Sequence, residues 1–276
     1  MSIEKVIHKY QKYLSFFRMR FIAGLQYRAA ALAGIATQFM WGALQLLMFR
    51  AFYEVNPDAF PMSREALASY IWLQQALLAL FMAWFYENEI FQSIIDGGVS
   101  YELCRPADIY DLWFVRSMAN RISKAVLRCL PILVVAAFLP KPYHMALPVS
   151  TIAGLWFVIT GILAFLNVVA FCMLVYISTF YTYSATGVRL ISVSIVEFFA
   201  GAVVPLPFLP EGVRKVVELL PFASMQNVPL RIYSGDISGI EVYQKAGIQV
   251  FWIVVLVWIG KKITASALKR IVVQGG

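Results

Sequence analysis

The chain has 276 residues, of which 61% are hydrophobic and only 14% are charged. An average soluble domain is about 45–50% apolar and about 25% charged, so this composition excludes an ordinary soluble protein and predicts an all-α membrane protein with several spans. The net charge of +8 is assigned to membrane topology rather than to nucleic-acid binding, because Lys and Arg concentrate in the cytoplasmic segments that flank membrane spans.

The segment 1–20 is predicted to be an amphipathic helix at the cytoplasmic membrane surface. Apolar residues recur along 3–17 at steps of three and four and share one helical face, whereas the lysines lie mostly elsewhere. Such a basic helix places its apolar face in lipid and its cations near anionic headgroups. The alternative is a short cytoplasmic tail with incidental periodicity.

Long apolar runs predict six membrane spans in residues 21–276, which form a single domain. A helix crosses the hydrocarbon core in about 20 residues. The spans are expected at about 21–49, 67–86, 125–139, 149–177, 188–204 and 246–259. The stretch 111–128 carries four cations among apolar residues, which predicts a helix lying at the interface before the third span. Runs such as LVVAAFL do not alternate apolar and polar residues, which argues against a β-barrel.

The segment 205–222 is predicted to enter the membrane from the outer side and return. The preceding span is short, and four prolines bracket a short amphipathic stretch at 211–220. Irregular backbone is tolerated at membrane depth only where protein or a cavity shelters it. An ordinary loop after a slightly longer span remains the alternative. The following stretch, 227–244, is expected to be a polar outer loop.

The distribution of Lys and Arg predicts that both termini are cytoplasmic. With that orientation, fifteen cations lie on the inner side and seven on the outer side. The count also places in the cytoplasm the charged island at 94–110, which separates the second and third spans and holds Glu102, Arg105 and Asp108.

Polar side chains inside predicted spans are candidates for a translocation path: Gln38, Gln45, Asn167 and Glu197. Intramembrane polar groups usually face protein or water. Hydrogen bonding between helices is the competing interpretation for the glutamines. Glu197 either pairs with Arg28 or Arg189, attracts a cationic substrate, is protonated, or fixes helix packing.

Catalytic and cofactor motifs are absent from the sequence. It contains no GxxxxGK[ST] phosphate loop, no GxSxG and no HExxH. The cysteines (Cys104, Cys129 and Cys172) and the histidines (His8 and His144) are scattered, which indicates neither a disulfide framework nor a metal site. We therefore expect no active site and no cofactor bound by this chain.

Two segments carry a resemblance to a known family. They are IIDGGVSYELCRP at 94–106 and VPLPFLPEGVRKVVELLPF at 204–222, the latter followed by Pro229 and by Tyr233-Ser234-Gly235. Their order and spacing, together with the layout of the spans, resemble the permease subunit of a bacterial type-2 ABC exporter.

The resemblance implies a role for each segment. A coupling helix in 93–111 is expected to dock on a separate ATPase. Its contact residues are expected to be Gly98, Glu102, Leu103, Arg105, Pro106 and Ile109. The segment 205–222 is expected to close the exit, with Pro205, Phe208 and Pro210 at the outer gate.

The resemblance also implies partners and a mechanism. Two ATPase subunits that carry ATP and Mg²⁺ are expected to work with this chain and a second permease, identical or related. The complex in the bacterial inner membrane is then expected to export a small amphipathic molecule, such as a drug or antibiotic, by alternating access.

Three alternatives stay open. The first is a lipid or polysaccharide exporter of the same class, which the abundant aromatic residues allow. The second is an ATP-independent carrier or a membrane scaffold; an inverted repeat would favour the carrier, and none is evident. The third is an intramembrane enzyme, which the missing acid–base cluster disfavours.

Overall fold

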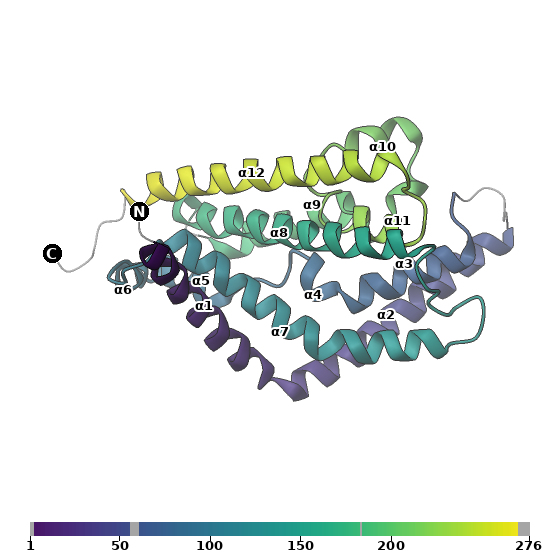
Figure 1. Ribbon diagram of the computed structural model, residues 1–276, viewed down its shortest axis with the longest axis horizontal. Helices are drawn as coiled ribbons and strands as arrows, with labels where there is room; N and C mark the ends of the chain where they lie inside the picture. The colour runs from purple at the N-terminus through teal and green to yellow at the C-terminus, as the bar shows by residue number, and fades with distance from the viewer. Residues whose placement is uncertain (1–2, 56–60, 183, 270–276) are drawn as a thin grey trace.

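The computed structural model of the chain describes residues 3–55, 61–182 and 184–269 (Figure 1). Within these ranges the regular elements are all helical, in agreement with the predicted fold class. They are α1 (Ile3–Leu25), α2 (Arg28–Val55), α3 (Arg64–Ala76), α4 (Leu78–Phe81), α5 (Asn88–Ile95), α6 (Val99–Leu103), α7 (Ile109–Phe138), α8 (Thr151–Thr182), α9 (Ala185–Phe199), the 3₁₀ turn η2 (Leu206–Phe208), α10 (Glu211–Val217), α11 (Asn227–Tyr233) and α12 (Ile240–Leu268).

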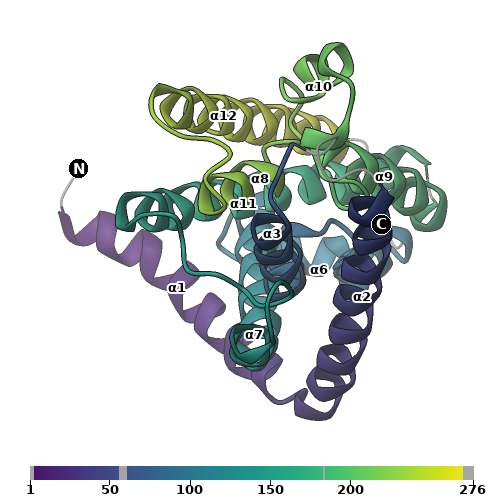
Figure 2. The same cartoon turned by 90° about the vertical axis from the view of Figure 1, so that its right-hand side faces the viewer.

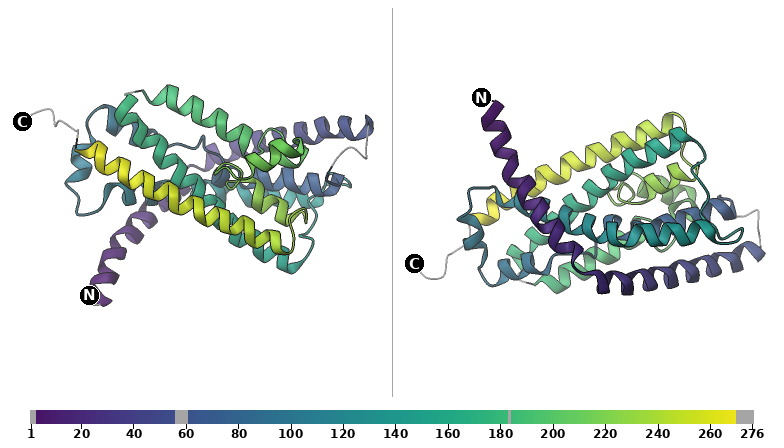
Figure 3. Two further views of the ribbon diagram at one scale, coloured as in Figure 1. Left: turned by 90° about the horizontal axis from the view of Figure 1, so that it is seen from above. Right: turned by 60° about the horizontal axis from the view of Figure 1, so that its bottom comes forward.

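Helix α8 is the centre of the bundle. It packs against α12, α11, α9, α5 and α7, and residues from Val168 to Ile177 in its second half belong to the largest apolar core. Helices α2, α7, α8 and α12 run along the long axis of the molecule, whereas α1 leaves the bundle obliquely (Figures 1 and 3). The extended hydrophobic stretches of the sequence thus become long, roughly aligned helices.

Three described helices are long and apolar enough to cross a membrane, namely α2, α8 and α12. Helix α7 has 30 residues but is interspersed with cations, and α9 has only 15. A 15-residue helix is about 22 Å long, short of the roughly 30 Å hydrocarbon core. Helix α9 is therefore as short as the sequence predicted for the fifth span. The prediction of six spans rests on charge and composition.

Two predicted boundaries are wrong. Helix α1 continues to Leu25, and after a turn at Gln26 and Tyr27 the first long apolar helix begins at Arg28 rather than at 21. The expected interface helix at 111–128 and third span at 125–139 form the single helix α7. The Arg116 and Arg121 side chains on α7 are buried against other helices, so these two cations are not placed at a membrane surface.

The second predicted span is interrupted. Helix α3 ends at Ala76, α4 adds one turn, and the chain from Met82 to Glu87 is not helical. No glycine or proline lies in 67–86 to announce a break. The unwound backbone is enclosed by protein: Met82, Ala83 and Tyr86 are buried. Such shelter is the condition under which irregular backbone is tolerated at membrane depth.

The region after α9 is built as predicted at first and differently afterwards. Helix α9 ends at Phe199, Gly201 takes a left-handed φ of 76°, and the short helix α10 lies inside the amphipathic stretch predicted at 211–220. The expected polar loop at 227–244 is wrong, because it contains the helix α11, all seven residues of which are buried. Its charged side chain, Arg231, has partners inside the protein, as described below.

The two ends of the bundle differ in content. The start of α1, the end of α12 and the short helices α5 and α6 share one end, while α10 and α11 lie toward the other (Figure 1). We call these the α6 end and the α10 end.

Candidate functional site

The α6 end carries a compact protrusion formed by α5, α6 and the start of α7 (Figure 3). Gly97 has a φ of 73°, a left-handed conformation that turns the chain between α5 and α6. Helix α6 ends shortly before Arg105-Pro106, because the residue before a proline disfavours the helical conformation. The Asp108 carboxylate then accepts a hydrogen bond from the Asp111 N–H at 3.0 Å and starts α7.

Contacts from both ends of the chain hold this protrusion. The Lys12 ammonium of α1 donates to the Pro106 carbonyl at 2.6 Å, and the Asp108 N–H donates to the Tyr13 hydroxyl at 3.3 Å. From α12, the Lys261 ammonium lies 2.7 Å from an Asp111 carboxylate oxygen. A displacement of the protrusion would therefore be transmitted to α1 and α12.

The structure distributes the predicted coupling residues between the surface and the interior. Leu103, Arg105 and Pro106 are exposed, whereas Gly98 is half-buried. The Glu102 carboxylate accepts a hydrogen bond from the Trp113 indole, and Ile109 is 4% exposed. Glu102 and Ile109 thus support the protrusion from within the chain, beneath the exposed residues.

Sequence reasoning missed one surface residue here. Tyr101, which is 82% exposed, lies on α6 between Ser100 and Glu102. An aromatic side chain left this open on a short, anchored helix is a contact group typical of protein interfaces. Helix α6 has only five residues, which is too few for a repeating apolar pattern to show which way Tyr101 faces.

Of the predicted path residues, Gln45 is part of a cluster of amides. The Gln75 amide donates to the Gln45 carbonyl oxygen at 3.2 Å, and the Gln74 amide donates to the Ala202 carbonyl at 2.8 Å. Gln45 also donates to the Ala202 carbonyl, at 3.4 Å. These bonds connect α2, α3 and the chain just after α9, so a movement of any one of them disturbs the other two.

The other predicted path residues are not brought together with this cluster. Gln38 lies about two turns from Gln45 on α2 and is 3% exposed, and its amide atoms are without a hydrogen-bond partner in the described structure. Asn167 joins α8 to α12 by donating to the Gln249 carbonyl at 3.1 Å. Glu197 is half-buried on α9. Arg189, which was one candidate partner for Glu197, instead donates to the Asn88 side-chain oxygen at 2.9 Å.

The interruption of the second span is organised by Arg121. This side chain is 1% exposed, and its guanidinium donates to the carbonyls of Ala79 at 3.2 Å and Met82 at 2.7 Å. A third bond reaches the Cys172 sulfur on α8 at 3.1 Å. The arginine thus satisfies carbonyls that the broken helix leaves free. Sequence reasoning missed this role, because Arg121 is one of four cations in 111–128 that were assigned together to the membrane interface.

The predicted outer-gate residues lie against α2 and at the start of α10. Pro205 is buried, and the Phe208 ring packs on Phe49 of α2 with 5.2 Å between ring centroids. Pro210 is exposed and immediately precedes α10. Phe208 therefore packs against α2, and the buried Pro205 lies three positions earlier in the chain.

A cluster of ions secures the same segment. The Glu218 carboxylate after α10 accepts hydrogen bonds from Arg231 of α11 and Lys245 of α12, and Arg231 also binds Asp236. Partial burial alone raises the pKa of the Glu218 carboxyl, but the hydrogen bond from Lys245 and the charge of Arg231 outweigh it, and the net pKa is below its usual value. Arg231 and Asp236, which lie in the stretch predicted to be a polar loop, are thus paired within the protein.

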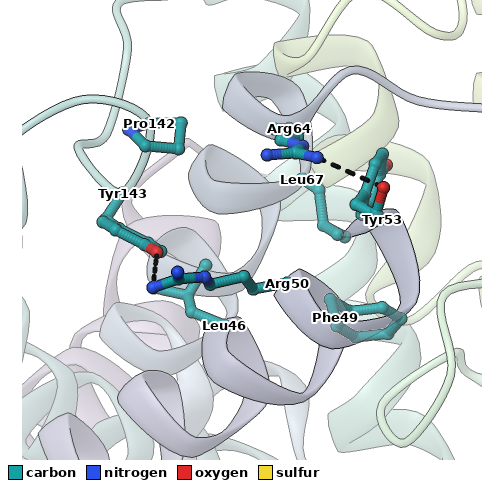
Figure 4. Close-up of a pocket in the computed structure, with 8 residues that line it drawn as sticks. All are labelled: Leu46, Phe49, Arg50, Tyr53, Arg64, Leu67, Pro142 and Tyr143. Atoms are coloured by element: carbon teal, nitrogen blue, oxygen red, sulfur yellow. Dashed lines mark hydrogen bonds between the residues drawn. The ribbon is translucent and has the colours of Figure 1, made fainter. Parts of the chain in front are cut away.

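A small pocket opens near the end of α2 and the start of α3 (Figure 4). The Arg50 guanidinium donates to the Tyr143 hydroxyl at 3.0 Å, and Arg64 donates to the Tyr53 carbonyl at 3.2 Å. The cavity measures about 30 Å³, which is roughly the volume of one water molecule in the liquid. Drug-sized ligands need roughly 300–1,000 Å³, so this pocket does not hold one.

The described residues contain no group of three or more His, Cys, Asp and Glu side chains that is arranged to hold a metal ion. What the arrangement offers is mechanical and electrostatic: an anchored protrusion, an amide cluster that bridges three segments, and an ion cluster that holds the α10 end.

Two comparisons with known proteins bear on this arrangement. A family model described as "ABC-2 family transporter protein" matches residues 39–275. A search of curated proteins found no match.

Proposed function

The chain belongs to the ABC-2 family of transporter proteins, and from this premise we propose that it is the permease subunit of an ATP-driven exporter. The exporter moves a small amphipathic molecule, such as a drug or antibiotic, out of the cytoplasm. A separate ATPase supplies the energy, and ATP and Mg²⁺ are bound there rather than on this chain.

The protrusion at the α6 end is the observation that carries this proposal. It presents Tyr101, Leu103 and Arg105 to the outside, while its buried side is held by Trp113 and its flanks by α1 and α12. An exposed group on an anchored element can receive a push without unfolding. The ATPase docks on this surface in our proposal.

The proposed topology follows the distribution of charge. The α6 end holds cations such as Lys12, Arg105 and Lys261, so it faces the cytoplasm under the positive-inside rule. Both termini are then cytoplasmic, and the protein lies in the bacterial inner membrane. The complex contains two ATPase subunits and a second permease, identical or related.

Alternating access follows from the contacts. ATP binding draws the two ATPase subunits together and moves both protrusions, and the ties to α1 and α12 pass that motion to the bundle. The Gln45 cluster joins α2 and α3 to the chain after α9, so their relative shift changes the seal formed by Pro205 and Phe208. Transport has a direction only if the two states of the permease bind the substrate with different affinities.

The test uses the complex purified from native membranes with its ATPase. We expect the double variant Tyr101→Ala/Arg105→Ala to lower ATP-dependent transport at least about tenfold with little change in melting temperature, because exposed substitutions usually alter stability by about 0.5 kcal/mol or less. The matched control is Tyr243→Ala/Lys215→Ala, which removes an exposed aromatic and an exposed cation at the α10 end. The control should transport normally.

Two outcomes would contradict the proposal. Normal coupling in Tyr101→Ala/Arg105→Ala would remove the protrusion as the docking surface. Transport by the chain without any co-purifying ATPase would favour an ATP-independent carrier. A lipid or polysaccharide exporter is distinguished by supplying those substrates to the same complex.

A further inference from the structure

A second cavity lies at the bend between α1 and α2. These helices meet in a V, and α7 passes between its arms (Figure 2). The space enclosed there, which we call the elbow cavity, has a volume of about 390 Å³. Its lining includes Arg20 of α1, Glu87 and Glu89 after the interrupted span, and Ser123, Lys124 and Arg128 of α7. This volume lies within the range of small-ligand sites.

The carboxylates of the elbow cavity are already matched by cations. Arg116, which is 4% exposed, binds Glu89 and lies 3.9 Å from Glu87. Arg20 also lies 3.4 Å from Glu89. Two carboxylates thus face two guanidiniums before the remaining lining residues are considered.

Two further cations on α7 are left without a carboxylate. Lys124 and Arg128 form no ion pair with any described residue; both instead lie over the Phe85 ring, at 5.4 Å and 5.9 Å from its centroid. Glu87 is the carboxylate whose charge acts on Lys124, but it also serves Arg116. An excess of positive charge in a partly buried cavity is costly unless an anion accompanies it.

Two arginines that line the same cavity have a donor without an acceptor. The Nε–H groups of Arg20 and Arg128 are buried without an acceptor among the described residues. The contact from Arg128 to the Ala30 carbonyl is long, at 3.5 Å. Guanidinium forks and an ammonium group together are the donor set that recognises phosphate oxygens.

The surroundings of the cavity indicate which kind of phosphate it takes. Tyr27 and Leu32, beside the bend, are 71% and 68% exposed, and Ile22 on α1 is 48% exposed. Apolar groups at this position would lie along acyl chains while the cations hold the headgroup. Basic pockets between helices on the cytoplasmic side of a membrane are suited to anionic lipids.

We propose that the elbow cavity binds the phosphate of an anionic phospholipid between Arg20, Lys124 and Arg128, with the acyl chains against the start of α2. The proposal rests on the proposed function only for placing this bend at the cytoplasmic leaflet. A lipid held here would fasten α1 to the bundle through the bend that joins it to α2.

The test measures lipid retention by the purified full-length protein in native mass spectrometry, with phosphatidylglycerol and phosphatidylcholine as probes. We expect wild-type protein to retain phosphatidylglycerol and the variant Lys124→Gln/Arg128→Gln to lose it about tenfold, because charge-assisted hydrogen bonds to phosphate are the strong ones. The matched control, Arg18→Gln/Lys262→Gln, removes two exposed cations outside the cavity and should retain the lipid.

Equal retention in the cavity variant, or equal loss in the control, would overturn the proposal. If the double variant fails to fold, Lys124→Gln alone serves, since Lys124 donates no hydrogen bond to a described residue, and about a threefold loss is then expected. Displacement of phosphatidylglycerol by millimolar inorganic phosphate, with equal affinity for both, would reassign the site to free phosphate. Retention needs no ATPase, so this result stands apart from the transport assay.

Discussion

Two ion pairs near opposite ends of the molecule differ in their burial. At the α10 end, Arg231 and Glu218 are nearly enclosed, with side chains 6% and 13% exposed. At the α6 end, the Lys261–Asp111 pair is 48% and 37% exposed. The Arg231–Glu218 pair therefore contributes to the integrity of its end, whereas the Lys261–Asp111 pair is open enough to be exchanged for contacts with a partner.

The difference matches the work that we propose for each end. A buried ion pair is costly to break, because each charge left alone stays desolvated. An exposed pair is worth little and is screened by salt. Buried ion pairs suit a segment that must stay closed until the whole bundle moves. Exposed ion pairs suit a surface that must bind and release an ATPase.

The largest expected effect is at Arg231. Replacing it by Met leaves the Asp236 carboxylate without its partner and removes one of the two close partners of Glu218, and we expect the free energy of unfolding to fall by about 3–5 kcal/mol. Thermal or denaturant unfolding of the purified protein measures this. The control is Lys215→Met, which removes an exposed pair with Glu211 and should leave the free energy of unfolding almost unchanged. Equal effects of the two variants would refute the contrast between buried and exposed ion pairs.

The next effect concerns pH and Glu218. Its folded-state pKa is lowered, so its contribution to stability is present above the unfolded carboxyl pKa of about 4.3 and is lost as pH falls through the folded value. We expect Glu218→Gln to destabilise by about 1.5–3 kcal/mol at neutral pH, the range for hydrogen bonds to charged groups. The gap between wild type and variant should narrow below about pH 4.3. A gap that stays constant down to acid pH would show that charge at Glu218 plays no part.

The long apolar helices were predictable from sequence, because a helix that crosses a lipid bilayer needs about 20 mostly apolar residues. Helices α2, α8 and α12 follow directly from apolar runs, and Pro205 correctly indicated a short α9. The break after α4 was not predictable in this way. No local residue causes it; the carbonyls of Ala79 and Met82 are held by Arg121, which lies about forty positions later in the chain.

The buried helix α11 shows the same limit. Its charged residue Arg231 is typical of a loop until Glu218 and Asp236 are placed around it. The candidate coupling residues were found by resemblance to a family, but which of them face outward depends on Trp113, which binds Glu102 from the next helix. Contacts between residues that are distant in sequence decide which of these side chains are buried, and local sequence patterns do not reveal such contacts.

A smaller effect separates Glu102 from Arg105 within the protrusion. Glu102→Ala removes the acceptor for the Trp113 indole, and we expect a loss of about 1–3 kcal/mol, the cost of leaving a buried donor unpaired. Arg105→Ala removes an exposed side chain and should leave the unfolding free energy within about 0.5 kcal/mol. Unfolding of the two single variants measures both, and Glu102→Gln should recover part of the loss because it keeps an acceptor. If Arg105→Ala were the more destabilising variant, Arg105 would be a structural residue and the docking surface would have to be redrawn.

The smallest effect is expected for the exposed tie between α7 and α12. A double-mutant cycle of Lys261→Met and Asp111→Asn should give a coupling energy of about 0.2–1 kcal/mol, as for other exposed pairs, and salt should reduce it further. Asp111 does not supply the carboxylate that caps α7, which is that of Asp108, so Asp111→Asn leaves the helix start intact. A coupling as large as that of a buried pair would mean that α12 is locked to the protrusion. In that case the α6 end could not release its ties when an ATPase docks, and the two ends would be held by the same kind of interaction.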